Sequence, residues 1–226
     1  FLVIARQLPR EEQEERMRRG DLVLNAGLYF TFRNQVLSLA TGDSADVSAD
    51  GPSREGFVLR NAWAVVPDIW FQLYYRGFHF EFEFAYIGGD VENTESDVAD
   101  TTTGTELRQF GGVVRADYTA LDGQLNVGLE FGYASGDAEL EGLTPRQTGG
   151  RLRQRSGFDG SEIDSNFRMD PDFNVDLILF EQILGQVAGA YYFRPWVEYE
   201  FIPNTLGVRA DVIYSLASAP MQTIGN

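Results

Sequence analysis

The most regular stretch of the chain lies between residues 77 and 88, where aromatic and mostly polar side chains alternate. This period of two places the two kinds of side chain on opposite faces of a β-strand, whereas a helix would spread both around its circumference. The aromatic positions are Phe78, Phe80, Phe82, Phe84 and Tyr86, and the positions between them are His79, Glu81, Glu83 and Ala85. The pattern therefore predicts a strand with one apolar and one polar face.

The same alternation recurs along most of the chain. It is found in residues 22–33, 57–75, 110–119, 125–133, 191–201 and 206–215. Together with residues 77–88, these stretches predict seven strands after Gly20, preceded by the end of an earlier strand in residues 1–5. Residues 57–75 keep one phase but contain Asn61 and Pro67, so they form either one long bent strand or two short strands. We expect further strands beyond both ends of the sequence.

Short and long connections alternate between these strands. Turns with typical turn residues lie at 76–77, 121–123 and 203–205, and long segments lie at 41–56, 89–104 and 135–186. Outer-membrane barrels have this asymmetry, with tight periplasmic turns and long external loops. The sequence thus predicts an all-β fold: a transmembrane up-and-down antiparallel β-barrel forming one domain over residues 1–226, with residues 135–186 as a long external loop. A soluble barrel or sandwich is the alternative, because its strands also alternate.

Residues 9–19 predict a short helix in a periplasmic turn. Pro9 suits the start of a helix, acidic residues come early and arginines come late, which matches the helix dipole. Glutamate and arginine are also spaced by four residues in the pairs Glu12/Arg16, Glu14/Arg18 and Glu15/Arg19. The helix is either a plain solvated turn or a docking site for a periplasmic partner.

Composition excludes several classes of protein. The 226 residues include no cysteine and no lysine, which removes disulfides, thiolate zinc sites, thiol nucleophiles and the P-loop. Because 34 Asp and Glu stand against 18 Arg, for a net charge of -16, nucleic acid is not an expected partner. No apolar run reaches the roughly 18 to 20 residues of a spanning helix, but barrel strands need only about 9 to 11 residues of alternating character.

In the predicted barrel, the polar positions line the lumen and the apolar positions face lipid. The lumen set is His79, Glu81, Glu83, Arg115, Asp117, Asn126, Glu130, Arg194, Glu198, Glu200, Arg209 and Asp211. The lipid set is Phe78, Phe80, Phe82, Phe84, Val114, Val127, Leu129, Val197, Val208 and Val212. Carboxylates outnumber arginines in the lumen set, so we expect an acidic lumen that prefers cations.

Catalytic and metal chemistry find little support in the sequence. His79 is the only histidine, which rules out a metal site with two histidines, and no Gly-x-Ser-x-Gly elbow is present. Hydrolysis by a serine and His79 stays open as a weaker alternative. Residues 158–164 contain closely spaced carboxylates without the spacing of an EF-hand loop. We therefore expect no enzyme activity, no metal and no cofactor.

The predicted loops carry two further features. Acidic residues in 41–50 and 90–100 are either solvated or bridged by divalent cations to lipopolysaccharide. Residues 175–187 have apolar side chains near helical spacing, with helix and strand both open, and we expect a packed rim or an inward-folded loop. The long loop also holds a basic cluster in an acidic chain, which lies in solvent, against lipid phosphates or against the acidic lumen: Arg146, Arg151, Arg153 and Arg155.

Three stretches resemble alginate-export-type porins and related Gram-negative outer-membrane β-barrel proteins. They are residues 27–30 (Gly-Leu-Tyr-Phe), residues 84–89 (Phe-Ala-Tyr-Ile-Gly-Gly) and residues 170–180, which begin Asp-Pro-Asp-Phe. The resemblance implies an outer-membrane barrel with long external loops, in contact with the lipid bilayer and lipopolysaccharide. Alginate exporters draw a polyuronate through an arginine-rich lumen. The acidic lumen expected here does not fit a polyanion, so we carry over the fold and not the substrate.

These observations leave three hypotheses of function. The first is a porin-like channel for small polar solutes, cationic or neutral. The second is a structural or interaction barrel of an envelope assembly, with a closed or plugged lumen. The third and weakest is an outer-membrane hydrolase.

Overall fold

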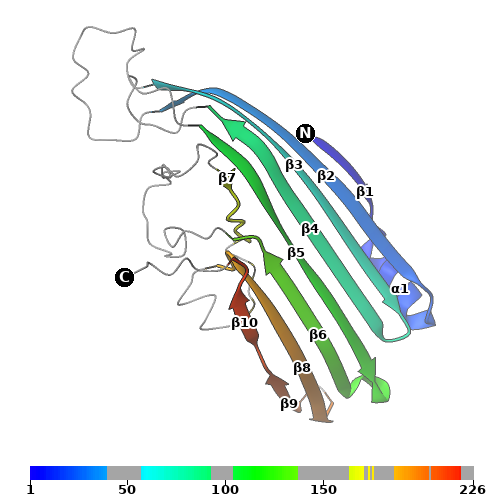
Figure 1. The fold of residues 1–226 in the computed structure, drawn as a ribbon. Helices are drawn as coiled ribbons and strands as arrows, with labels where there is room; N and C mark the ends of the chain where they lie inside the picture. The colour runs from blue at the N-terminus through cyan, green and yellow to red at the C-terminus, as the bar shows by residue number, and fades with distance from the viewer. Residues whose placement is uncertain are drawn as a thin grey trace, which may run out of the picture.

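A computed structural model of the chain describes residues 1–39, 57–92, 104–136, 163–170, 173, 175, 186–203 and 205–219. In these residues the chain forms one long, curved and mostly antiparallel β-sheet with a single α-helix (Figure 1). None of the helices described here has the length and apolar character needed to cross a lipid bilayer.

Neighbouring strands in the sheet follow one another in the sequence. The order is β1 (Leu2–Arg6), β2 (Val23–Leu39), β3 (Phe57–Tyr75), β4 (Phe78–Val91), β5 (Thr105–Ala120), β6 (Leu125–Ala134), β8 (Ala190–Ile202) and then β9 (Leu206–Asp211) with β10 (Tyr214–Ala217). The short strand β7 (Ile163–Asp164) runs parallel to β5, beyond the end of β6. Within the described residues β1 is one edge of the sheet and the β9–β10 pair is the other, so the sheet is open.

The strand predictions are confirmed, and prolines explain where pairing is interrupted. Residues 57–75 form a single strand, so the alternative of two short strands is wrong; its pairing with β4 lapses beside Pro67, which has no N–H to donate. The expected last strand is split into β9 and β10. The split falls opposite Pro195, whose carbonyl accepts a 3.1 Å hydrogen bond from the Val212 N–H but which has no N–H to return.

Tight turns set the register of the hairpins. Arg76 and Gly77 join β3 to β4 with φ values of 47° and 82°, as a two-residue turn of the primed type requires. A side chain at Gly77 would also meet the carbonyl oxygen of Thr119 at 2.5 Å. The β5–β6 connection is the 3₁₀ turn η1 (Leu121–Gly123).

The predicted helix is present as α1 (Arg10–Arg19), and Gly20 ends it in the left-handed conformation with φ 75°. Two of the expected ion pairs form, Arg16–Glu12 at 2.7 Å and Arg19–Glu15 at 3.0 Å. The third is wrong: Glu14 pairs with Arg10 at 2.9 Å instead. All three pairs are solvent-exposed to a large extent, so each adds only a few tenths of a kcal/mol, roughly.

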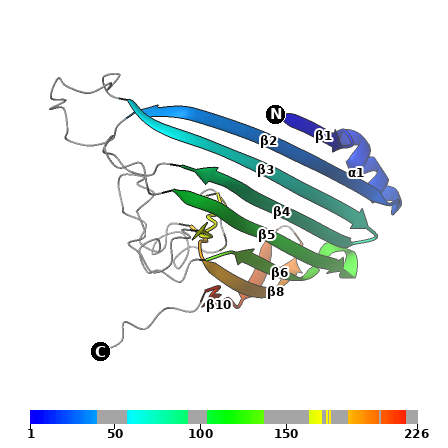
Figure 2. The ribbon, with the colours of Figure 1, turned by 45° about the horizontal axis from the view of Figure 1, so that its top comes forward.

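The sheet has two chemically different faces. One face carries cross-strand rows of large apolar side chains, such as Phe82, Val114, Phe131 and Phe193 on β4, β5, β6 and β8. Many of these side chains are exposed, and Val208 and Val212 are 59% and 65% exposed. Nine residues of the predicted lipid set lie on this face in the strand registers, and Val212 follows directly after β9; we call it the apolar face. The other face, the polar face, curves around the segment that contains β7 (Figure 2).

Candidate functional site

A row of hydrogen-bonding side chains crosses the polar face on six adjacent strands. The register places Asn25, Gln72, Glu81, Arg115, Glu130 and Arg194 opposite one another in that order. At one end, Asn25 Nδ2 donates to Gln72 Oε1 at 3.1 Å, and Gln72 Nε2 donates to Glu81 Oε1 at 2.6 Å. Antiparallel pairing thus assembles a continuous polar row from residues far apart in the sequence.

His79 lies between two carboxylates next to this row. Its Nδ1 is 3.0 Å from Asp117 Oδ1, and its Nε2 is 3.0 Å from Glu81 Oε1. The ring of Tyr74 stacks on the imidazole with centroids 4.2 Å apart. Asn126 Nδ2 donates to the second Asp117 oxygen at 3.4 Å and so helps to fix the carboxylate that contacts the imidazole.

The arginines gather around Trp196 on β8. The Cζ atoms of Arg115 and Arg209 lie 5.0 Å and 5.4 Å from the centre of the Trp196 ring, within reach of a cation–π interaction. The indole Nε1 donates to Asn126 Oδ1 at 2.8 Å, and the side chain is only 5% exposed.

Carboxylates accompany these arginines. Arg194 Nη2 is 2.9 Å from Asp211 Oδ1, and Arg209 Nε is 2.8 Å from Asp211 Oδ2. Glu198 lies 3.5 Å from Arg209. The positive charges on β5, β8 and β9 are therefore largely compensated by carboxylates next to them.

Negative charge dominates the β3–β4 part of the polar face. Asp68 is diagonal to Glu83, because the register pairs Trp70 with Glu83 and Asp68 with Ala85. Among the described residues no arginine lies within 4 Å of either carboxylate, and Asp68 Oδ1 is buried without a hydrogen-bond partner. Negative charge on the polar face is therefore least compensated at Asp68 and Glu83 on β3 and β4, whereas the arginines on β5, β8 and β9 lie beside carboxylates.

A segment of the long connection folds over the polar face. This inward segment comprises residues 163–170, 173 and 175. The Phe167 N–H donates to the Ser135 carbonyl at 2.8 Å, and Ser135 Oγ donates to the Ser165 carbonyl at 2.6 Å. A core of buried apolar residues forms between segment and sheet: Ala134, Phe167, Met169, Val175, Val187, Ala190 and Tyr192. The expectation of a packed rim or an inward-folded loop concerned residues 175–187. Of these, Val175 and Val187 are buried in this core, and residues 176–185 lie outside the described residues.

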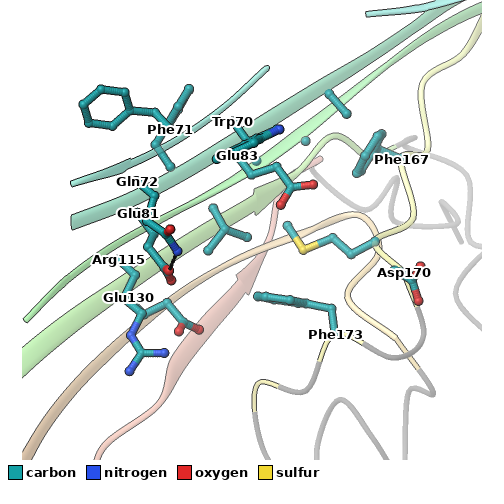
Figure 3. Close-up of a pocket in the computed structure, with 16 residues that line it drawn as sticks. Trp70, Phe71, Gln72, Glu81, Glu83, Arg115, Glu130, Phe167, Asp170 and Phe173 are labelled. Carbon is teal, nitrogen blue, oxygen red and sulfur yellow. Dashed lines mark hydrogen bonds between the residues drawn. The ribbon is translucent and has the colours of Figure 1, made fainter. Parts of the chain in front are cut away.

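A cavity of about 420 Å³ separates part of the inward segment from the sheet. Trp70 and Glu83 border it from the sheet, and Phe167 and Phe173 border it from the inward segment (Figure 3). Arg115 and Glu130 lie toward the other end, where Tyr192 Oη donates to Glu130 Oε1 at 2.8 Å. The cavity thus combines aromatic walls with an acidic lining.

The structure brings most of the predicted lumen residues into one connected set of contacts. Glu83 borders the cavity, Glu130 accepts a hydrogen bond from Tyr192 Oη, and Glu200 lies near the end of β8, where its N–H donates to the Gln124 carbonyl at 2.8 Å. The predicted lumen set left out Asn25, Asp68 and Gln72, although all three have the same two-residue phase as the residues in that set. The cavity walls Phe167 and Phe173 had no such signal.

Several predicted features lie outside the described residues. They are the basic cluster of Arg146, Arg151, Arg153 and Arg155, the acidic residues of 41–50 and 93–100, residues 158–162, and residues 176–185, where helix and strand were both left open. In the part of the chain that is described, no group of three or more histidine, aspartate or glutamate side chains is placed to hold a metal ion. Comparisons of this chain with protein-family models, with curated proteins and with solved structures found no match.

Proposed function

We propose that the chain forms the wall of an outer-membrane β-barrel channel in a Gram-negative bacterium, through which small polar solutes pass. The observation that carries the proposal is the division of one curved sheet into an exposed face of large apolar side chains and an opposite face of connected charged side chains. Water disfavours so large an apolar surface, whereas lipid accepts it without cost. A lipid bilayer and lipopolysaccharide are therefore the proposed surroundings.

The proposed barrel requires that the two open edges of the sheet be paired. An unpaired row of backbone N–H and C=O groups is not tolerated in lipid, so a spanning sheet must close on itself. We propose that further strands pair with β1 and with the β9–β10 pair. Apart from the short strand β7, the strands from β1 to β8 each pair with the strands before and after them in the sequence, and this order fits an up-and-down barrel.

The charges of the polar face favour cations and neutral polar solutes. Arg194 and Arg209 have carboxylates beside them, whereas Asp68 and Glu83 have no arginine within 4 Å among the described residues. A polyanion would gain little from compensated arginines and would be repelled by those carboxylates. We therefore keep the barrel fold that the resemblance to alginate-export-type porins implies, and propose a different class of solute.

A second candidate is a structural or interaction barrel whose lumen is plugged. The buried apolar core between the inward segment and the polar face favours it, because apolar side chains there exclude water from part of the lumen. The two candidates share the barrel and differ in whether a water-filled path remains beside the inward segment.

Conductance of the full-length protein, refolded and inserted into planar bilayers, separates the two candidates. The channel predicts discrete conductance steps and a reversal potential in a potassium chloride gradient with the sign of cation preference. A plugged barrel predicts insertion without steps. Anion preference would overturn the proposed solute class, and failure to insert into lipid at all would overturn the barrel.

A further inference from the structure

We infer that the cavity beneath the inward segment is a binding site for an organic cation with an apolar body, such as a protonated aromatic or alkyl amine, and that Glu83 is its ion-pair partner. The inference deepens the proposed function and rests on it only for the route by which the solute reaches the cavity. The cavity, its walls and its charge are properties of the described residues.

The size and walls of the cavity suit a small organic molecule. Its volume of about 420 Å³ falls in the usual range of ligand pockets, roughly 300 to 1,000 Å³. Trp70, Phe167 and Phe173 supply aromatic surface, and Met169 adds an adaptable thioether. Figure 3 shows Glu83 facing the space between the sheet and the Phe167 side of the inward segment. An apolar body can therefore lie against the aromatic rings while its charged end meets Glu83.

The lining carries an excess of negative charge. Glu81, Glu83, Glu130 and Asp170 line the cavity with Arg115 as the one arginine among its described lining residues. The Arg115 charge is already engaged, since its guanidinium stacks on Trp196 and its Nε lies 3.4 Å from Asp117 Oδ1. Glu81 is bound by Gln72 and lies beside His79. Glu130 accepts a 2.8 Å hydrogen bond from Tyr192 Oη. Among the lining carboxylates of the sheet, Glu83 is therefore the one that gains most from a cation in the cavity.

The same features decide against other ligands. An anion would meet several carboxylates in a site partly shielded from water, where repulsion is strong. A bare metal ion prefers several oxygen ligands in a close shell, and the described residues hold no such group. An ammonium group beside aromatic rings gains both an ion pair and cation–π attraction. An amine with an apolar body is therefore the chemical class that can contact both the aromatic side chains and the carboxylates of this cavity.

The binding experiment uses full-length protein in detergent micelles and follows tryptophan fluorescence while phenethylammonium is added. We expect a saturable change that is lost in Trp70→Phe, because Trp70 is the tryptophan that borders the cavity. The variant Glu83→Gln keeps the side-chain shape and removes the charge, so it should weaken binding by about tenfold or more. Glu106→Gln is the matched control, since the exposed Glu106 side chain pairs with Arg108 on the same strand and does not line the cavity.

Two further probes test the ligand class. Benzoate, an anion of similar size, and ammonium, a cation without an apolar body, should both fail to give the saturable change. Equal affinity in Glu83→Gln, or binding of benzoate as tight as that of phenethylammonium, would overturn the inference.

The outcome for the channel is measured separately in planar bilayers. Saturable binding without conductance would reject the proposed channel and leave the binding site standing. Cation-selective conductance without saturable binding would reject the binding site and leave the proposed channel standing. If both hold, phenethylammonium should block the potassium current in the wild-type protein and in Glu106→Gln, and block it far less in Glu83→Gln.

Discussion

The ring of Phe167 lies directly on Gly111, so closely that a Cβ at position 111 would sit 2.3 Å from two of its carbon atoms. Gly111 belongs to the polar face of β5, and Phe167 belongs to the inward segment. The absence of a side chain at this position is therefore what allows the segment to pack onto the sheet. Substitutions at this contact can therefore test whether the inward segment limits conductance through the proposed lumen.

Replacing Gly111 by alanine should displace the inward segment. The overlap with the Phe167 ring cannot be relieved without moving the segment or the strand, and overpacking of this kind costs roughly 1 to 3 kcal/mol. We expect larger single-channel conductance and faster cleavage of the long connection by added protease. The double variant Gly111→Ala/Phe167→Ala removes the overlap, so the two changes should be non-additive in a double-mutant cycle of unfolding free energy. Additive effects would mean that the two residues are not in contact.

The apolar face should face lipid. Val127 and Val208 both lie on it, at 39% and 59% exposed. Replacing either by arginine should lower the free energy of unfolding from lipid vesicles by about 2 to 4 kcal/mol if the site is near the midplane of the bilayer. The same change at Gln124, in the connection before β6, is the control and should cost much less. If spin labels at Val127 and Val208 were reached by water-soluble relaxants and not by lipid-soluble ones, the barrel would be inside out.

Cation preference should depend on the carboxylates of β3 and β4. A unit charge about 8 Å away contributes roughly 0.5 kcal/mol even in water, so Asp68→Asn and Glu83→Gln should each lower the cation-to-anion permeability ratio by roughly twofold. Arg209→Gln should shift it the other way. Reversal potentials in a salt gradient measure these shifts, and they should shrink in concentrated salt, because the screening length at about 0.15 M is roughly 8 Å. If none of the three substitutions changed the permeability ratio, other residues would have to set the selectivity.

Trp196 should stabilise the arginine side of the polar face. Trp196→Phe keeps an aromatic ring but removes the hydrogen bond to Asn126, which should cost about 1 kcal/mol. Trp196→Leu also removes the surface on which Arg115 and Arg209 stack, so it should cost more. Urea unfolding in lipid vesicles compares the two variants. Equal costs would show that the stacking adds nothing beyond the hydrogen bond.

The sequence also predicts a role for the arginines of the long connection, which lie outside the described residues. If Arg146, Arg151, Arg153 and Arg155 fold into the external mouth, changing them to alanine should raise conductance and sharpen cation preference. If they meet lipid phosphates, conductance should stay the same and binding to lipopolysaccharide should weaken. No change in either measurement would identify the cluster as an ordinary solvated loop.

Local chemistry was enough to predict the strands, the turns and the helix. Alternation with a period of two assigned Phe82 and Glu81 to opposite faces without any knowledge of their neighbours, because side chains of a strand point to alternate sides. The turn at Arg76–Gly77 was predicted from its own residues, because glycine readily adopts the positive φ that such a turn needs. Strand alternation and turn residues are properties of a few consecutive residues, so they can be recognised in the sequence alone.

Tertiary structure alone decided which side chains of the polar face contact one another. Glu81 and Arg115 face each other, and Tyr192 reaches Glu130 over 62 residues of chain, only because β4 pairs with β5 and β6 pairs with β8 in these registers. The course of the inward segment was equally undetermined by the sequence, since Phe167 has no periodic pattern around it and packs where Gly111 on another strand has no side chain. Long-range packing selects such contacts by shape, and shape across strands is not encoded in any local run of residues. The alternation therefore determined which residues share the polar face, and the packing of the inward segment decided that part of this face encloses a cavity.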